Sequence, residues 1–211
     1  MERADWTGST PLFAAVMGNH LECVELLTGD GGSNLHATRK DGWTPLFAAS
    51  RQGYLDIVRE LIDAGAEVDR GIRIDGETTT PFFVACQEGH LDVAGCLHDR
   101  GADVDLRTMA GGDTALSMAC HAGEFHVAQF VLERGGQFDA PGYQDLTPAA
   151  IAEKEGHQHI VVLLKAAKMQ AENAGKSLDE IMEMQRQLEA EALAAGDDAA
   201  DEDDEDDEDD Y

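Results

Sequence analysis

Residues 41–69 read DGWTPLFAASRQGYLDIVRELIDAGAEVD and predict two short helices joined by a tight turn. Thr44 can cap a helix that starts at Pro45, because threonine is a preferred N-cap and proline at the first helical position loses no hydrogen bond. Gly53 stands nine residues after Thr44, where a residue with left-handed backbone would end this helix. A second apolar stretch, residues 55–62, follows and closes with a Gly-Ala pair. The segment therefore predicts a helix–turn–helix unit.

The same unit recurs along the chain with a nearly constant period. Its opening threonine returns at spacings of 34, 36, 34 and 33 residues, as Thr10, Thr44, Thr80, Thr114 and Thr147. Each predicted helix pair is apolar on one side only, so it must stack on a neighbour to bury that side. A period of this length is typical of a stacked-repeat solenoid. We expect the terminal units to be the least stable, because each has one neighbour instead of two.

These residues resemble the pattern of the ankyrin repeat family, D-G-x-T-P-L-H-x-A-A-x-x-G-H-L-x-x-V-x-x-L-L-x-x-G-A, over about residues 5–168. Departures include Phe13, Phe47 and Phe83 in place of the histidine after Thr-Pro-Leu or its equivalent, and Asn19 in place of a glycine. The resemblance implies an all-α solenoid of stacked helix pairs joined by β-hairpin-like loops. We expect five repeats, at about residues 5–38, 39–72, 73–108, 109–141 and 142–168.

The chain changes character after the fifth repeat. A Ser-x-x-Glu capping box and apolar residues at helical spacing predict a helix within residues 169–196. This helix can cap the exposed flank of the fifth repeat, engage a partner, or remain solvated. Twelve of the fourteen residues at 197–210 are acidic. We expect residues 197–211 to form a disordered tail, because such a run repels itself and has little apolar surface to bury.

The charge of the chain restricts its partners. Forty-three acidic and fifteen basic side chains give a formal net charge of −28. This balance argues against direct binding of nucleic acid or of an anionic membrane, and no apolar run is long enough to span a bilayer. The four cysteines lack C-x-x-C spacing and are expected to be small core residues in a reducing compartment. We expect a monomer in the cytoplasm and leave the nucleus open, because small proteins enter nuclei without an import signal.

The sequence offers little support for catalysis. It contains no G-x-S-x-G elbow, P-loop, H-E-x-x-H helix or dinucleotide-binding glycine motif. His20, His90 and His157 recur at one repeat position, where the resemblance implies packing and hydrogen bonding. His121 and His126 could be imagined as metal ligands, but no cysteines or carboxylates complete a set at the usual spacing. We therefore expect no enzymatic activity, no cofactor and no metal site.

The resemblance implies that partners dock on a concave surface formed by the hairpin tips and the first helix of each unit. The family's binding positions, carried over to this sequence, are fifteen residues: Lys40, Asp41, Trp43, Arg51, Gln52, Glu77, Thr79, Gln87, Glu88, Asp113, His121, Tyr143, Gln144, Lys154 and Glu155. Trp43 is the expected anchor, because it lies beside a turn glycine and exposed tryptophan is enriched at binding hot spots. For Trp43 and Tyr143, local packing remains an open alternative.

We therefore expect a non-catalytic adaptor that binds partner proteins through its concave face. The alternative is an acidic chaperone-like or histone-binding protein whose tail engages basic partners. Seven of the thirteen basic residues before residue 169 fall on hairpins or first-helix positions: Arg39, Lys40, Arg51, Arg70, Arg73, Arg107 and Lys154. That count makes the concave face relatively basic, and we hypothesise that the acidic tail competes for it. The other hypothesis is a tail that only keeps the chain soluble.

Overall fold

The computed structural model of the chain describes residues 9–29, 34–40, 42–74, 77–107, 112–142, 145–172 and 186–187. These ranges form ten α-helices and one two-stranded sheet. In chain order the elements are α1 (Pro11–Met17), α2 (Leu21–Gly29), α3 (Pro45–Gln52), α4 (Leu55–Asp63), β1 (Ile72–Ile74), β2 (Glu77–Thr79), α5 (Pro81–Gln87), α6 (Leu91–Asp99), α7 (Ala115–Ala122), α8 (Phe125–Glu133), α9 (Pro148–Lys154) and α10 (Gln158–Glu172).

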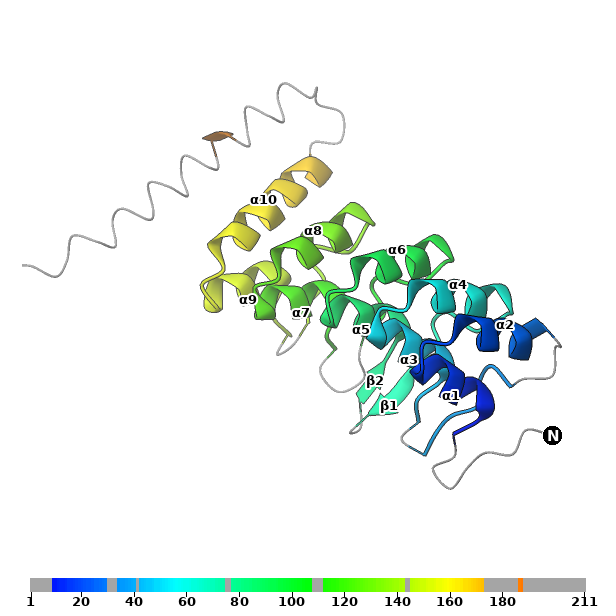
Figure 1. Cartoon of the computed structure of the whole chain (residues 1–211). Helices are drawn as coiled ribbons and strands as arrows, with labels where there is room; N and C mark the ends of the chain where they lie inside the picture. The colour runs from blue at the N-terminus through cyan, green and yellow to red at the C-terminus, as the bar shows by residue number, and fades with distance from the viewer. Residues whose placement is uncertain are drawn as a thin grey trace, which may run out of the picture.

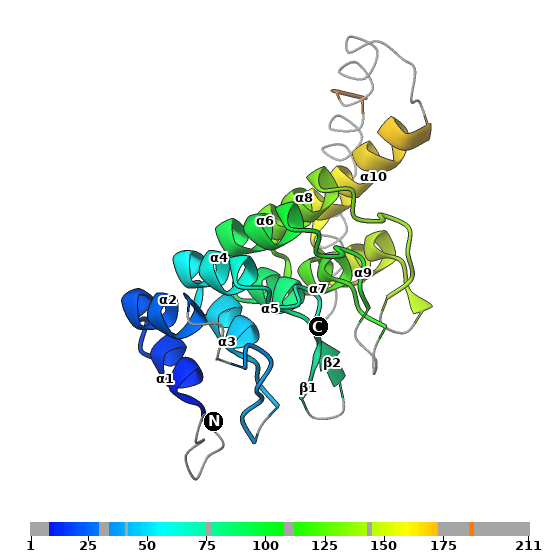
Figure 2. The same cartoon turned by 90° about the vertical axis from the view of Figure 1, so that its right-hand side faces the viewer.

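The helices lie in two layers. The first helices of the units, α1, α3, α5, α7 and α9, form one layer, and the second helices, α2, α4, α6, α8 and α10, form the other (Figure 1). The antiparallel strands β1 and β2 pair Ile72 with Thr79 and form a hairpin that projects from the side of the first layer (Figure 2). The expected all-α solenoid of stacked helix pairs is confirmed.

The first helices begin as the sequence predicts. In each unit the hydroxyl of the opening threonine accepts a hydrogen bond from the backbone N–H three residues later, at 3.1 to 3.3 Å. Proline follows this threonine in every unit but the fourth, where Ser117 completes a capping box with Thr114 instead. Asn19 adopts the left-handed φ of 54° at the position where the other units have glycine. Each first helix therefore starts at a capping threonine and is followed by a glycine or asparagine with left-handed backbone.

The core fills the space between the two layers. One apolar cluster runs through all the units, from Leu12 in α1 to Leu164 in α10. Ala49 and Ala85 are fully buried, and their small side chains let neighbouring first helices pack closely. No helix in the described part of the chain has the length and apolar character needed to cross a membrane.

Histidines join successive units at one recurring position. A Cβ atom built on Gly53 would lie 2.7 Å from Nδ1 of His90, and one built on Gly123 would lie 2.7 Å from Cε1 of His157. In both places the histidine ring of one unit therefore lies against the glycine that ends the first helix of the preceding unit. A side chain on that glycine would force the histidine ring, or the unit that carries it, to shift.

The predicted C-terminal segments fall mostly outside the described residues. Helix α10 continues past the expected end of the fifth repeat to Glu172. Within the predicted helix of residues 169–196, the structure otherwise describes only residues 186–187, which are helical. The acidic run at 197–211 lies outside the described part of the chain, and the division of the chain into these segments stays a prediction.

Candidate functional site

A groove of about 490 Å³ crosses the first layer at α5, α7 and α9. We call it the first-helix groove. It is lined by side chains from three successive units: Phe83, Gln87, Asp113, Ser117, Met118, His121, Ala122, Glu124, Leu146, Ile151, Lys154 and Glu155. Five of these were selected from the sequence, namely Gln87, Asp113, His121, Lys154 and Glu155. The structure thus brings together five selected residues that lie up to 68 positions apart, from Gln87 to Glu155.

The floor of the groove is apolar. Phe83 and Ile151 belong to the core and are 9% and 4% exposed, whereas Met118 and Leu146 are half-buried. All four pack against the main core cluster. These four were not selected from the sequence, because the selected positions are polar except for Trp43 and Tyr143, and the positions of these four within the repeat also suit core residues. The floor offers a partner apolar surface that is already held rigidly by the core.

The rim of the groove is acidic. It carries the carboxylates of Asp113, Glu124 and Glu155, against the single ammonium group of Lys154 among the described lining residues. Asp113 Oδ1 accepts a hydrogen bond of 2.9 Å from the hydroxyl of Ser117. Nε2 of His121 lies 4.0 Å from Oε1 of Glu155 on the same rim.

This acidic rim is only part of the face that the sequence analysis expected to be relatively basic, and Lys154 is the one residue of those seven basic residues that lines the groove as described. Counting residues by position overlooked the carboxylates that accompany the basic side chains. Nε of Arg51 donates a 3.1 Å hydrogen bond to Glu88, and Nη1 of Arg70 lies 3.5 Å from a carboxylate oxygen of Glu67. The positive charges of Arg51 and Arg70 are therefore paired with neighbouring carboxylates.

Trp43 lies between the second unit and the hairpin of the third. Its ring meets Phe47 edge to face, with centroids 5.4 Å apart, and the Arg51 guanidinium lies 4.9 Å from the Trp43 ring centroid. The same ring packs against a small cluster that includes Ile72 of β1. Trp43 is thus half-buried against its neighbours, as the local-packing alternative describes, and its role as a partner anchor stays a prediction.

Five of the remaining selected residues lie on α3, at the end of α5, and on the loop and hairpin that precede these two helices. Lys40, Gln52 and Glu88 are exposed, Thr79 is half-buried in β2, and Glu77 begins that strand. The structure places none of these five on the first-helix groove as described. Three further selected residues lie outside the described ranges: Asp41, Tyr143 and Gln144.

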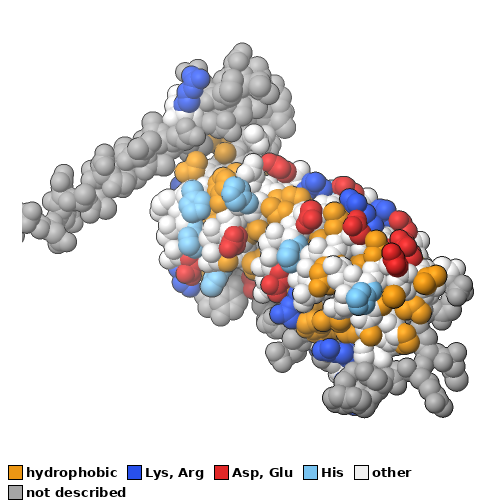
Figure 3. Space-filling view, in the orientation of Figure 1, with side chains coloured by type: hydrophobic (Ala, Val, Ile, Leu, Met, Phe, Trp, Pro, Cys, Tyr) orange, Lys and Arg blue, Asp and Glu red, His pale blue; other side chains and the backbone are white. Residues whose placement is uncertain are grey.

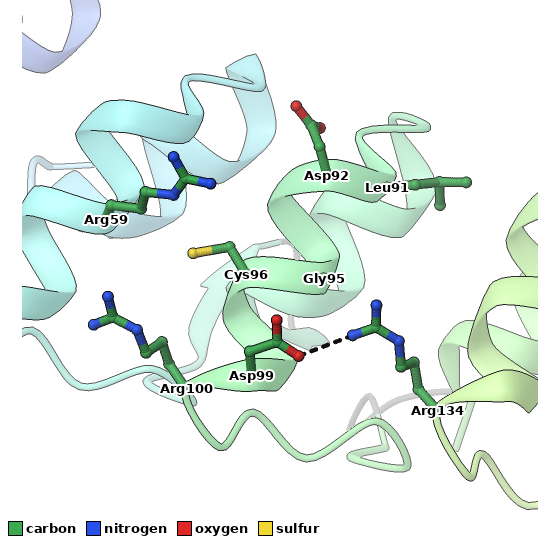
Figure 4. Close-up of a pocket in the computed structure, with 8 residues that line it drawn as sticks. All are labelled: Arg59, Leu91, Asp92, Gly95, Cys96, Asp99, Arg100 and Arg134. Atoms are coloured by element: carbon green, nitrogen blue, oxygen red, sulfur yellow. Dashed lines mark hydrogen bonds and ion pairs between the residues drawn. The ribbon is translucent and has the colours of Figure 1, made fainter.

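A second groove, of about 350 Å³, lies on the second layer around α6. Arg59 and Arg100 lie on one side of this helix and Arg134 on the other, where Nη1 of Arg134 donates a 3.1 Å hydrogen bond to Asp99 (Figure 4). Basic and acidic side chains are interleaved along this edge of the stack (Figure 3). The hydrogen bond from Arg100 lowers the pKa of Asp63 below its ordinary value. These pairs join second helices across unit boundaries, and the sequence reasoning did not find them.

Two cysteine thiols of the described core, Cys86 and Cys120, are buried. Burial raises the pKa of the Cys86 and Cys120 thiols to about 12, so both remain protonated at neutral pH. Among the described residues, no group of three or more histidine, cysteine or carboxylate side chains is arranged to hold a metal ion. What the first-helix groove offers is a contact surface with an apolar floor and a charged rim.

Comparison with known proteins points to the same kind of surface. A family model described as ankyrin repeats in three copies matches residues 1–72 and 82–174. Protein phosphatase 1 regulatory subunit 27 of Mus musculus is 44% identical over 63 residues, which is 30% of this chain and 40% of that protein. The protein of the same name from Homo sapiens matches with the same identity and coverage. The matched segment therefore spans well under half of these curated relatives.

Proposed function

Because this chain belongs to the ankyrin repeat family, we propose that it is a non-catalytic adaptor that binds partner proteins through its first-helix groove. The observation that carries the proposal is the convergence of side chains from three successive units on one apolar floor. A partner segment laid along this groove would touch α5, α7 and α9 at once. Its affinity would therefore depend on the stacking of the units as well as on individual side chains.

The groove has an apolar floor surrounded by a polar rim, which is the usual arrangement of a protein interface. Met118 and Leu146 are half-buried, so a partner can remove further apolar surface from water. The exposed residues Gln87, Lys154 and Glu155 surround that surface with hydrogen-bonding and charged groups, which set register and exclude unsuitable partners. This division supports protein binding over binding of a small polar molecule.

The names of the matched relatives suggest a first partner to test. Both are regulatory subunits of protein phosphatase 1, and a regulatory subunit acts through another protein. We therefore propose a protein phosphatase as the first candidate partner. The similarity extends over 63 residues only, so the experiment must also be able to detect partners that are unrelated to phosphatases.

The test is affinity capture with the full chain, followed by direct binding measurements on the purified partner. Ala122→Trp places a bulky ring in the groove, because Ala122 is an exposed residue of its lining. Ala64→Trp makes the same replacement at an exposed site after α4, in the second layer, and serves as the matched control. We expect Ala122→Trp to weaken partner binding at least tenfold and Ala64→Trp to leave it unchanged. Equal effects of the two variants would refute binding at the groove.

The acidic run at residues 197–210 supports a second candidate function, in which it engages basic proteins by charge. A full-length variant with Asn and Gln in place of the Asp and Glu of that run distinguishes the two. Binding through the groove weakens only in its electrostatic part after this change and in high salt, and it persists because burial of apolar surface is little screened. If binding is lost with the run or with salt while Ala122→Trp has no effect, the acidic run is the functional element.

A further inference from the structure

We infer that the first-helix groove selects a partner segment in which one large apolar side chain is flanked by lysine or arginine. The inference rests on the proposed function, because it names the chemistry of the partner at that same groove. Its two parts come from the floor and from the rim.

The floor accepts a large apolar side chain. Phe83, Met118, Leu146 and Ile151 are the large apolar side chains among the twelve residues that line the groove, whose volume of about 490 Å³ exceeds that of any single side chain. Transfer of one leucine- or phenylalanine-sized side chain from water to an apolar site favours binding by roughly 10- to 150-fold. An entirely polar segment would leave this surface unused.

The rim selects for positive charge beside that apolar residue. Asp113, Glu124 and Glu155 outnumber Lys154 among the charged groups of the described lining, and Glu124 and Glu155 are exposed to an incoming segment. The chain as a whole carries a formal charge of −28, so its field also attracts basic segments and repels acidic ones. Charge complementarity therefore excludes the chain's own acidic run as the preferred occupant of this groove.

The experiment begins with a displayed library of random twelve-residue peptides selected on the immobilised full chain. The enriched peptides are synthesised, and their affinities are measured for the full chain and for three variants. Glu124→Gln/Glu155→Gln neutralises two groups on the rim, and Glu22→Gln/Glu25→Gln removes the same charge from exposed positions of α2 as the matched control. Ala122→Trp obstructs the groove itself.

We expect the enriched peptides to carry lysine or arginine on both sides of a leucine, methionine, phenylalanine or tryptophan. Two exposed ion pairs strengthen binding by roughly 2- to 30-fold together, so Glu124→Gln/Glu155→Gln should weaken it by that factor and the control should not. Two outcomes with Ala122→Trp abolishing binding would refute the inference and leave the proposed function standing. In the first, the enriched peptides lack basic residues. In the second, Glu124→Gln/Glu155→Gln and Glu22→Gln/Glu25→Gln bind the peptides equally. If the peptides bind Ala122→Trp as tightly as the unchanged chain, the inference and the groove itself are both wrong.

Discussion

Replacing Gly53 with alanine should destabilise the stack more than the same replacement at Gly89. The two glycines occupy the same position in successive units, with φ of 74° and 77°, so alanine carries a similar left-handed backbone cost of about 1–2 kcal/mol at each. At Gly53 the added Cβ would also lie 2.7 Å from Nδ1 of His90, whereas at Gly89 no described atom lies within 4 Å. Overpacking of this kind costs about 1–3 kcal/mol. We therefore expect about 2–5 kcal/mol of destabilisation at Gly53 and about 1–2 kcal/mol at Gly89.

Thermal and urea unfolding of the full chain, followed by circular dichroism at the helical band, measures this difference. For a chain of this size each kcal/mol lowers Tm by about 2–4 °C, so Gly53→Ala should melt roughly 2–12 °C below Gly89→Ala. In a His90→Ala background, Gly53→Ala should lower the free energy of unfolding only as much as Gly89→Ala does, because the ring that meets the new Cβ is gone. Equal effects of the two glycine replacements in the unchanged background would refute the interlocking of units through His90.

Three further results follow from the local chemistry. Thr44→Ala removes the cap of α3 and should lower the free energy of unfolding by about 0.5–2 kcal/mol in urea titration; no change would mean that the cap contributes nothing. The pKa of Asp63 lies below its usual value near 3.8, so this group stabilises the fold at neutral pH and the contribution is lost as pH falls through the folded pKa. An NMR titration of Arg100→Gln should show that pKa rising toward 3.8, and an unmoved pKa would contradict the pairing. At pH 8 an alkylating reagent should modify exposed Cys23 and spare Cys86, because burial raises the pKa of the Cys86 thiol to about 12. Cys86 should react once urea unfolds the chain. Mass spectrometry measures the labelling of both residues, and equal labelling in the folded chain would contradict the burial of Cys86.

The fold follows from signals that act over a few residues. The Thr-Pro pair at Thr44 and Pro45 predicts the start of α3, and Gly53 predicts its end, because each acts through its own backbone geometry. The predicted second helix, residues 55–62, differs from α4 by one residue at its end. The stacking is predicted in turn by the apolar side of each pair, since no unit can bury that side alone.

The candidate site depends on contacts between units, which a single unit does not reveal. The resemblance placed Gln87, His121 and Lys154 on one layer, and they do meet in the groove. The charge of the rim was not predicted, because seven basic residues were counted over the whole concave face, and only Lys154 of those seven lines the groove as described. The apolar floor was likewise missed, since Leu146 comes from the unit that follows Met118 and contributes only when the units are stacked.

The central claim is that partners bind to the first layer at α5, α7 and α9. Hydrogen–deuterium exchange of the full chain, with and without a purified partner obtained by capture, tests it directly. The account predicts slower exchange in residues 81–87, 115–122 and 148–154 when the partner is bound, with unchanged exchange in α4 and α6 of the second layer. Protection confined to the second layer, or to residues 173–211, would contradict it.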